Sequence, residues 1–457
     1  MALTQGATAR RGAGLGLVFG IGFFGSLLYW ISIIGYLGWA LLVLLQASFL
    51  ALLGLVWTFT SRLSFWATRI LAAAAAWEAI EFIRAMVPAG GFTWGQLSQS
   101  QTELSWLLPA AALGGGWLVA GIVVALNASL VETFGALQLG ARTRAAAALG
   151  TVAALLAAPF VVQPNDATGD EVDVAIVQGN VPRSFEGSSL DKELAILESH
   201  RHLTEELVDL APDLVVWPES SVGLDLRTNV DSANAVRSAA QAVGAPMIVG
   251  GNLDVGGDRY KVMAFQIDPA GEIVDRYQKT HLVPFGEYVP ARGLLDWIPA
   301  LDQVPRDAVA SDEPVVFDVA GGKVAPVISF EGDFGSLVRK PIADGGRLLV
   351  VATNTSTWED SWASAQHVAF SRVRAVENGV WVAHAALSGI SAFISPRGEV
   401  VDSTPLWVPA ALVHELRFAE GITPYARFGD WFPLLSIAAT LVALVAAGRR
   451  GLLRKRR

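Results

Sequence analysis

VAPVISFEGDF (324–334) is a short apolar run that places a serine and a glutamate directly after an expected buried β-strand. Between residues 164 and 430 such runs alternate with amphipathic segments of helical period. Strands are expected at Val172–Val177, Leu214–Trp217, Pro246–Gly250, Val324–Ser329, Leu348–Ala352, Val380–Ala385 and Ile390–Ser395, and helices at Leu190–Leu210, Val230–Val243 and Ser361–Glu377. This alternation predicts an α/β layered domain with a buried sheet, whose reactive groups lie on loops at strand ends.

Outside this block the composition changes. The 457-residue chain is 53% hydrophobic and 16% charged, whereas soluble domains are about 45–50% apolar and about 25% charged. Charged residues are sparse up to Val162, dense from Pro164 to Asp430, and then absent until Arg449. We therefore expect a membrane block (1–163, about five spans), a water-soluble block (164–430) and a C-terminal span with a basic tail (431–457). The net charge of −9 argues against a nucleic-acid partner.

Five stretches carry the roughly 20 apolar residues that a membrane span needs: Gly14–Ile34, Leu37–Phe59, Leu107–Leu126, Ala145–Val162 and Phe432–Ala447. A weaker sixth, Phe65–Val87, contains Arg69, Glu78, Glu81 and Arg84. Two interpretations of these charges stay open. They belong either to an interfacial or bundle-facing helix with charge pairs three residues apart, or to a polar feature that faces a lipid-handling cavity.

The basic residues predict the orientation of the chain in the membrane. Arg10, Arg11, Arg62, Arg142, Arg144 and the basic tail all fall on one side of about six spans. The connections at residues 32–36 and 88–106 contain neither Lys nor Arg. Because basic connections stay in the cytoplasm, the water-soluble block is expected outside it.

Three residues with reactive side chains follow apolar strands of the soluble block. Glu219 comes after VVWP (215–218), Lys279 after VDRYQ (274–278), and Ser329 after VAPVI (324–328). Each alone is an ordinary strand-end residue, and Ser329 lacks the Gly-x-Ser-x-Gly frame of an α/β-hydrolase.

Together these stretches carry a resemblance. VVWPESS (215–221), YQKTHLVPFGEYVP (277–290) and VISFEG (327–332) resemble the nitrilase-type carbon–nitrogen hydrolase pattern, in which a glutamate, a lysine and a cysteine recur in this order. The chain also resembles the apolipoprotein N-acyltransferase family through GGFTWGQLSQSQ, VQGNVP, TNTSTW, HVAFSRVRAVENG and YARFGDWF, which begin at residues 90, 177, 353, 367 and 425. The usual family member is expected to carry one or two further spans at its N-terminal end.

The resemblance implies a polytopic α-helical membrane bundle with an extracytoplasmic nitrilase-like domain, an αββα sandwich. It implies location in a bacterial cytoplasmic membrane and acyl transfer from a phospholipid, through an acyl-enzyme, to the α-amino group of a diacylated lipoprotein. Glu219 then matches the general base and Lys279 the catalytic lysine, with Ser329 at the nucleophile position. Glu287 and Glu331 match supporting glutamates that would hold the lysine charged and oriented.

The segment from Thr280 to Pro314 has little regular pattern, which is typical of a functional loop. Candidates for contact with substrate or for a lid are Phe285, Tyr288, Trp297, Phe330 and Trp358. The apolar residues of 282–299 either enter the membrane interface or gate acyl chains, or else they pack on their own domain.

The chain contains no cysteine at all, so Ser329 stands where the family has its nucleophile. An aliphatic hydroxyl is much harder to ionise than a thiol. Three explanations stay open: an engineered Cys→Ser change, a natural serine paralogue with reduced or altered transfer, and a catalytically silent relative that binds lipid or lipoprotein.

No cofactor or metal is expected from the sequence. His200 and His202 are two residues apart on an expected helix, so they do not share a face as zinc ligands would. The expected partners are a phospholipid acyl donor, a diacylated lipoprotein or lipopeptide acceptor and the membrane, and the chain is expected to be a monomer.

Overall fold

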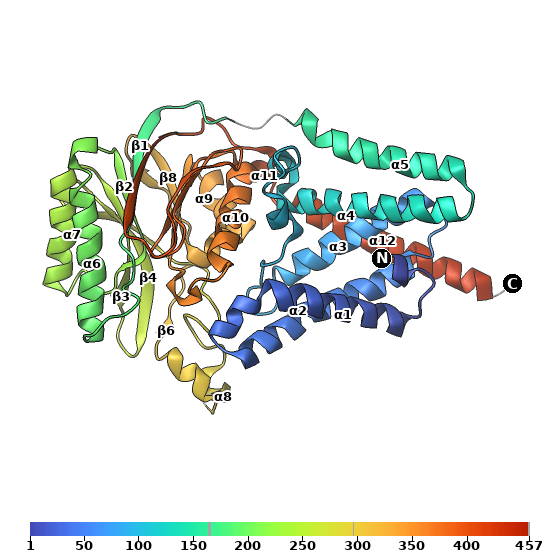
Figure 1. The fold of residues 1–457 in the computed structure, drawn as a ribbon, viewed down its shortest axis with the longest axis horizontal. Coiled ribbons are helices and arrows are strands. Elements are labelled where there is room, and N and C mark those ends of the chain that lie inside the picture. Colours follow the sequence, from blue (N-terminus) through green and yellow to red (C-terminus); the bar gives the residue numbers. More distant parts are fainter. Residues whose placement is uncertain (163–165, 296, 456–457) are drawn as a thin grey trace. The chain divides into compact units, whose positions relative to one another are not determined.

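A computed structural model describes residues 1–162, 166–295 and 297–455 (Figure 1). The chain forms two compact units. The α/β unit comprises Pro164–Arg427, and the helical unit comprises Met1–Gln163 together with Phe428–Arg457.

The α/β unit is built on two β-sheets. The first has the order β13-β1-β2-β3-β4-β5, with β6 beside β4, and the second has the order β12-β11-β10-β9-β8-β7. Parallel pairing joins β1 to β2, β2 to β3, β8 to β9 and β9 to β10, and the edges of both sheets are antiparallel. The strands are β1 Glu171–Gln178, β2 Leu214–Val222, β3 Met247–Asp254, β4 Arg259–Ile267, β5 Ile273–Gln278, β6 Asp307–Ala308, β7 Phe317–Val319, β8 Gly322–Ile328, β9 Leu348–Thr353, β10 Val382–Ala386, β11 Ala392–Ile394, β12 Val400–Ser403 and β13 Ala410–Arg417.

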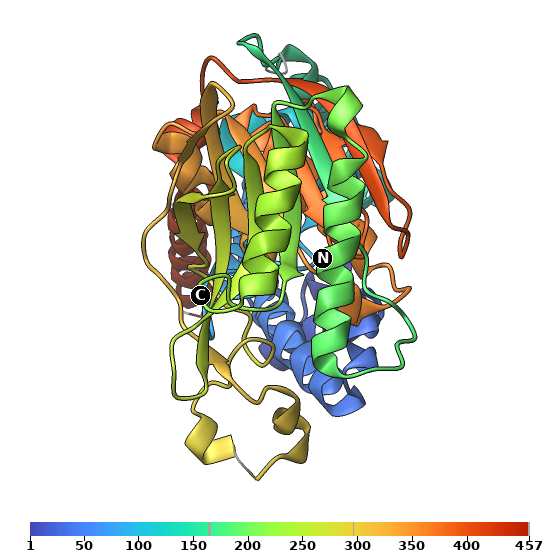
Figure 2. The ribbon, with the colours of Figure 1, turned by 90° about the vertical axis from the view of Figure 1, so that its left-hand side faces the viewer.

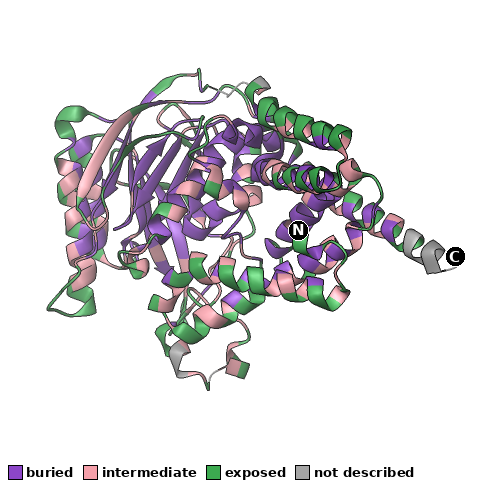
Figure 3. Cartoon of the chain, turned by 45° about the vertical axis from the view of Figure 1, so that its right-hand side comes forward, coloured by how far each residue is buried: buried purple, intermediate pink, exposed green. Residues whose placement is uncertain are grey.

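The two sheets pack against each other, and helices cover their outer faces. Alternate residues of β1 show the layering: Val174 and Ile176 face the second sheet, whereas Ala175 and Val177 pack under α6 (Ser189–Glu205) and α7 (Val230–Val243). These two helices lie side by side across the first sheet (Figure 2). Helices α9 (Gly335–Ala343) and α10 (Ala363–Asn378) cover the second sheet, and the central strands are buried (Figure 3). The predicted αββα layering is confirmed.

The strands and helices expected from apolar runs are present, with end points that shift by a few residues. The sequence pattern did not predict β4, β12, β13 or α9, and it did not delimit β5. Strand β5 has four exposed residues and β13 is mostly half-buried, so neither shows the continuous apolar run of a central strand. In the segment 280–314, the described residues (all but 296) form α8 (Arg292–Leu295), β6 and a short 3₁₀ turn at Pro299–Gln303 and are otherwise irregular, as the sequence pattern indicated.

The helical unit contains α1 (Ala9–Leu27), α2 (Tyr36–Thr60), α3 (Trp66–Arg84), α4 (Ala111–Gln138), α5 (Arg142–Ala157) and α12 (Trp431–Lys455). Four helical segments of the described chain are long and apolar enough to cross a membrane: Tyr36–Thr60, Leu108–Gln138, Arg142–Phe160 and Trp431–Arg449. Helix α1 begins and ends earlier than the expected span, because a 3₁₀ turn occupies Tyr29–Ile33.

The charges of α3 point into the helical unit, and both arginines have partners outside the helix. Arg69 bonds to Glu132 of α4, with Nε–Oε1 at 2.7 Å. Arg84 donates to Gln46 and to the carbonyls of Phe92 and Trp94. Both side-chain oxygens of Glu78 are buried without a hydrogen-bond partner among the described residues. The bundle-facing interpretation is therefore correct about the burial of Glu78, Glu81 and Arg84, and Glu81 and Arg84, three residues apart, also interact electrostatically.

Candidate active site

Ser329 lies on a strained turn at the end of β8. Its φ of +50° is in the left-handed region, which non-glycine residues rarely adopt. The residue opens a short 3₁₀ helix, η8 (Ser329–Asp333), and is 7% exposed. Parallel pairing of Ile328 with Ala352 brings the end of β9 alongside, and Thr353 Oγ1 lies 3.1 Å from Ser329 Oγ. Such a strained, over-determined position is typical of functional residues.

Glu219 reaches the same place from the other sheet. It lies on β2 just after Pro218, where the pairing of β2 with β3 shifts in register. Its Oε2 accepts a hydrogen bond of 2.9 Å from the backbone N–H of Asn354, the residue after Thr353. The last residue of β9 and the residue after it therefore contact Ser329 and Glu219, which brings the hydroxyl and the carboxylate to one end of the sandwich.

The backbone of β3 approaches Glu219 closely at Gly250. A Cβ atom on Gly250 would lie 2.1 Å from the carbonyl oxygen of Pro218 and 2.7 Å from Cα of Glu219. Glycine is required here because any side chain would displace the segment that carries the carboxylate.

Lys279 follows β5 and is almost completely buried, with 1% of its side chain exposed. Its Nζ lies 3.0 Å from Oε1 of Glu219 and 2.6 Å from Oε1 of Glu287. The second oxygen of Glu287 accepts a bond of 2.7 Å from Val283 N–H, which fixes the loop that carries this glutamate. A buried ammonium group is stable only with such partners.

The electrostatics of this cluster favour a charged lysine beside a basic carboxylate. Burial alone would lower the pKa of Lys279, but Glu219 and Glu287 outweigh it and hold that pKa above its ordinary range. Burial raises the pKa of Glu219, Lys279 opposes the rise, and Glu287 adds to it. A carboxylate with a raised pKa is a better proton acceptor, and a fixed cation can stabilise a developing oxyanion.

Glu331 has no direct hydrogen bond to Lys279 among those the structure gives, but its charge favours the charged lysine and its bonds fix the segment that follows Lys279. Its Oε1 accepts bonds from Tyr277 Oη (2.8 Å), from Thr280 N–H (2.6 Å) and Oγ1 (2.7 Å), and from His281 N–H (3.0 Å). Its Oε2 accepts a bond of 2.8 Å from Ile328 N–H. Glu331 therefore ties the chain around Lys279 to the turn that carries Ser329, whereas Glu287 contacts the lysine directly.

The five lid and substrate candidates have different surroundings. Phe285 and Trp297 are 53% and 77% exposed, so they do not pack on their own domain. Phe330 is buried and stacks on His281 with ring centroids 5.5 Å apart. Tyr288 is half-buried, with its carbonyl bonded to Phe285 N–H, and Trp358 packs edge-on against His367.

The sequence pattern assigned no role to Thr353 or Asn354. Both lie in the segment TNTSTW (353–358), directly after the apolar run 348–352. The position of polar residues at the end of a parallel strand was the signal that could have found them.

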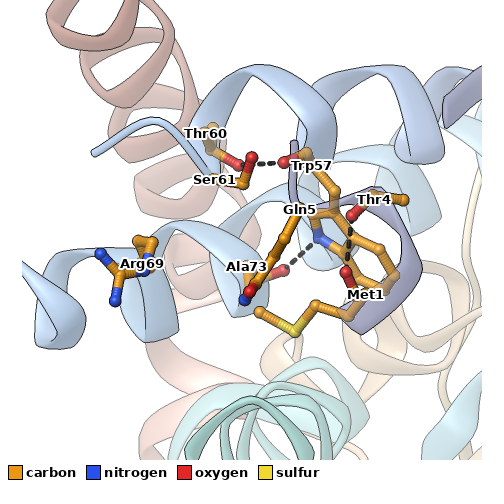
Figure 4. A pocket seen from close by; sticks show the side chains of 8 residues that line it. All are labelled: Met1, Thr4, Gln5, Trp57, Thr60, Ser61, Arg69 and Ala73. Atoms are coloured by element: carbon orange, nitrogen blue, oxygen red, sulfur yellow. Dashed lines mark hydrogen bonds between the residues drawn. The ribbon is translucent and has the colours of Figure 1, made fainter. Parts of the chain in front are cut away.

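Two further observations concern metal binding and cavities among the residues that the structure describes. No group of three or more His, Cys, Asp or Glu side chains in this part of the chain could hold a metal ion. A small cavity in the helical unit is lined by Met1, Thr4, Gln5, Trp57, Thr60, Ser61, Arg69 and Ala73 (Figure 4). It contains none of the expected site residues.

Family models match both parts of the chain. Residues 1–129 match the family model "Apolipoprotein N-acyltransferase N-terminal domain", and residues 173–421 match "Carbon-nitrogen hydrolase". An amidase of the nitrilase superfamily from Nesterenkonia AN1 is 19% identical with a TM-score of 0.44, and the match covers 57% of this chain and 95% of the amidase.

Two relatives are similar over nearly the whole chain. The apolipoprotein N-acyltransferase of Geobacter metallireducens is 30% identical over 96% of this chain and 88% of the relative. That of Mycolicibacterium smegmatis is 31% identical over 98% of this chain and 80% of the relative. The chain therefore belongs to the apolipoprotein N-acyltransferase family.

Proposed function

We propose that this protein transfers an acyl chain from a phospholipid, through an acyl-enzyme on residue 329, to the α-amino group of a diacylated lipoprotein cysteine. One observation carries the proposal. A buried ammonium group, Lys279, is held between Glu219 and Glu287, while the consecutive residues Thr353 and Asn354 contact the strained Ser329 and Glu219 respectively.

In the first step, Oγ of Ser329 attacks the ester carbonyl of the phospholipid. Glu219 accepts the hydroxyl proton and returns it to the departing lysophospholipid oxygen, so a new ester replaces the old one. In the second step, the free amine of the acceptor attacks the Ser329 ester. An amide forms, and the amine proton returns through Glu219 to Oγ.

Lys279 would act on the oxygen of each tetrahedral intermediate. It has no need to exchange a proton, because its two carboxylate partners keep it charged. A preorganised cation in a water-poor site contributes more than the same charge in water. Glu287 would hold the cation in place, and Glu331 would keep the lysine segment next to the nucleophile turn.

The proposed setting is a bacterial cytoplasmic membrane, in which the protein is a monomer and the α/β unit lies outside the cytoplasm. Support comes from the four membrane-capable helices and from the basic residues of the expected cytoplasmic connections. Exposed Phe285 and Trp297 suit contact with acyl chains or with the membrane interface.

The hydroxyl of Ser329 favours a second candidate, a silent or altered-activity paralogue that binds lipid or lipoprotein. A serine lacks the easily formed thiolate of cysteine, and its ester is a less reactive acyl donor than a thioester. The groups around residue 329 suit a thiol as well as a hydroxyl. Among the described residues the hydrogen-bond partner of Ser329 Oγ is Thr353, so a thiol would have only this contact to preserve.

The test uses the full chain and its Ser329→Cys variant with a phospholipid and a synthetic diacylated lipopeptide. We expect the lipopeptide to gain one acyl mass, faster with Ser329→Cys, and Glu219→Ala to abolish the gain in both. If neither chain transfers an acyl group while both bind the lipopeptide, the binding-protein candidate holds and the enzyme proposal fails.

A further inference from the structure

A second buried cluster of ionisable residues packs against η8 (Ser329–Asp333), the turn that carries the proposed nucleophile. The proposed acyl transfer assigns no role to this cluster. Asp333 is the last residue of η8, the 3₁₀ helix that Ser329 opens, and its side chain is fully buried. His367 of α10 is 1% exposed, and its Nε2 lies 3.2 Å from Oδ1 of Asp333. The five-residue turn that presents Ser329 is therefore held at its far end by a side chain from α10.

The same imidazole also contacts the loop after β9. Trp358 ends the 3₁₀ turn Ser356–Trp358, in the segment that begins with the two residues that contact Ser329 and Glu219. Its ring meets the His367 ring edge-on, with centroids 5.8 Å apart. One side chain thus contacts both segments that frame the reactive hydroxyl.

Further buried polar side chains lie near His367 without a hydrogen bond to it among those the structure gives. The His384 ring lies edge-on to it at 5.0 Å, and His384 Nδ1 is 2.8 Å from Ser371 Oγ. Arg374 and Glu377 form a further buried pair on α10, with Nε–Oε2 at 3.1 Å. Burying these polar groups costs desolvation free energy that an apolar core would avoid, and their close ion-pair contacts offset part of that cost.

We propose that Asp333 and His367 are positioning residues, which fix the turn of Ser329 against the loop of Thr353 and Asn354. This inference rests on the proposed function, because the alignment that it maintains is that of the nucleophile with its base. A left-handed serine keeps its conformation only if its surroundings over-determine it, and the His367 contacts supply that restraint from outside the site.

Three variants distinguish a positioning role of His367 from a role in which its ring merely fills space. His367→Phe keeps an aromatic ring and loses the bond to Asp333, whereas His367→Gln keeps a donor within reach of that carboxylate. Ser371→Ala, on the same helix, removes the partner of His384 and leaves the His367–Asp333 contact intact. Each is made in the full-length Ser329→Cys chain, which then has a single thiol because the chain has no other cysteine.

In single-turnover acylation by a phospholipid, we expect His367→Phe to lower the maximal rate about 10- to 100-fold, with KM changed less than about twofold because no substrate contact is removed. His367→Gln should recover most of this rate, and Ser371→Ala should match the parent. If His367→Phe is folded and acylates at the parental rate, or if the rates of all three variants follow their melting temperatures, the inference fails.

A second readout does not need acyl transfer at all. The pH profile of alkylation by iodoacetamide reports how the single thiol is placed beside Glu219 and Lys279. We expect its midpoint to shift in His367→Phe and to stay in place in His367→Gln and Ser371→Ala. Superimposed profiles would overturn the inference. A shifted profile in a Ser329→Cys chain that transfers no acyl group would instead locate the failure in the proposed function.

Discussion

The carboxylates that surround Lys279 in the α/β unit and the carboxylate Glu132 in the helical unit are paired in different ways. Glu219 and Glu287 share one lysine, and each also accepts a backbone N–H. In the helical unit, Glu132 bonds to Arg69 and Arg144, while Glu78 has no hydrogen-bond partner among the described residues. In the α/β unit the carboxylates outnumber the cation, whereas at Glu132 the cations outnumber the carboxylate.

We interpret this difference as one between the proposed catalytic site and a packing contact. Burial raises the pKa of Glu219, and the neighbouring carboxylate of Glu287 adds to the rise although Lys279 opposes it. Glu132, by contrast, pairs with two guanidinium groups. Substitutions in the two units can break or sharpen this contrast.

The largest effect is expected from Lys279→Met in the Ser329→Cys chain. The change leaves Glu219 and Glu287 as two buried carboxylates without a cation. We expect acylation to fall about 10²–10³-fold through loss of oxyanion stabilisation, and the free energy of unfolding to fall by about 3–5 kcal/mol. Single-turnover acylation and denaturant unfolding in detergent measure the two effects.

Lys323→Met is the matched control for that change. Lys323 lies 3.6 Å from Asp318, and both side chains are more than half exposed, so its loss should change stability by less than about 1 kcal/mol. Equal losses in both variants would show that Lys279 has no special role.

In the helical unit, Glu132→Gln and Glu78→Gln should differ in their effect on stability. Glu132→Gln removes the charge between Arg69 and Arg144, and we expect a loss of about 2–3 kcal/mol, below the range for fully buried pairs because Arg144 is partly exposed. Glu78→Gln removes no hydrogen bond, so the unfolding free energy should stay the same or rise. Equal destabilisation by both variants, in detergent unfolding, would contradict the contrast within this unit.

The pattern of strands made part of the site predictable from the sequence. The hydrogen-bond and ion-pair partners that depend on how turns and helices pack could not be predicted. Reactive groups were expected at strand ends: Ser329 does follow the parallel strand β8 and Lys279 the antiparallel edge strand β5, whereas Glu219 lies within β2 near its register shift. The bonds of Glu331 to Thr280 and Ile328 depend on how two loops meet, and no spacing in the sequence encodes this. The pairing of Arg69 with Glu132, 63 residues away, likewise depends on helix packing and not on the spacing within α3.

A smaller effect is expected from Gly250→Ala, which tests how finely Glu219 must be placed. The added Cβ would overlap the Pro218 carbonyl and displace the Glu219 backbone. We expect about a tenfold loss of acylation rate in the Ser329→Cys chain, since small displacements of a reacting group carry costs of this order. Gly421→Ala is the control, because a Cβ at Gly421 meets nothing within 4 Å. An unchanged acylation rate in Gly250→Ala would show that the Glu219 side chain can be displaced without loss of activity, despite the close packing of Gly250 against its backbone.

The smallest effect is a shift in the pH dependence of acylation. Only ionised Glu219 accepts a proton, and burial together with Glu287 raises its pKa, so the rate should fall on acidification at a higher pH than for an ordinary glutamate. Glu287→Gln removes a repulsive carboxylate and leaves Lys279 to Glu219 alone, and both changes favour the ionised form. The acid limb should therefore move to lower pH, even though the maximal rate falls because Lys279 is less firmly held.

Glu78→Gln should leave the limb in place, since that carboxyl belongs to the helical unit. A limb that moves to higher pH in Glu287→Gln would mean that Glu287 contributes mainly by orienting Lys279 toward Glu219, and the contrast between the units would then rest on geometry and not on charge.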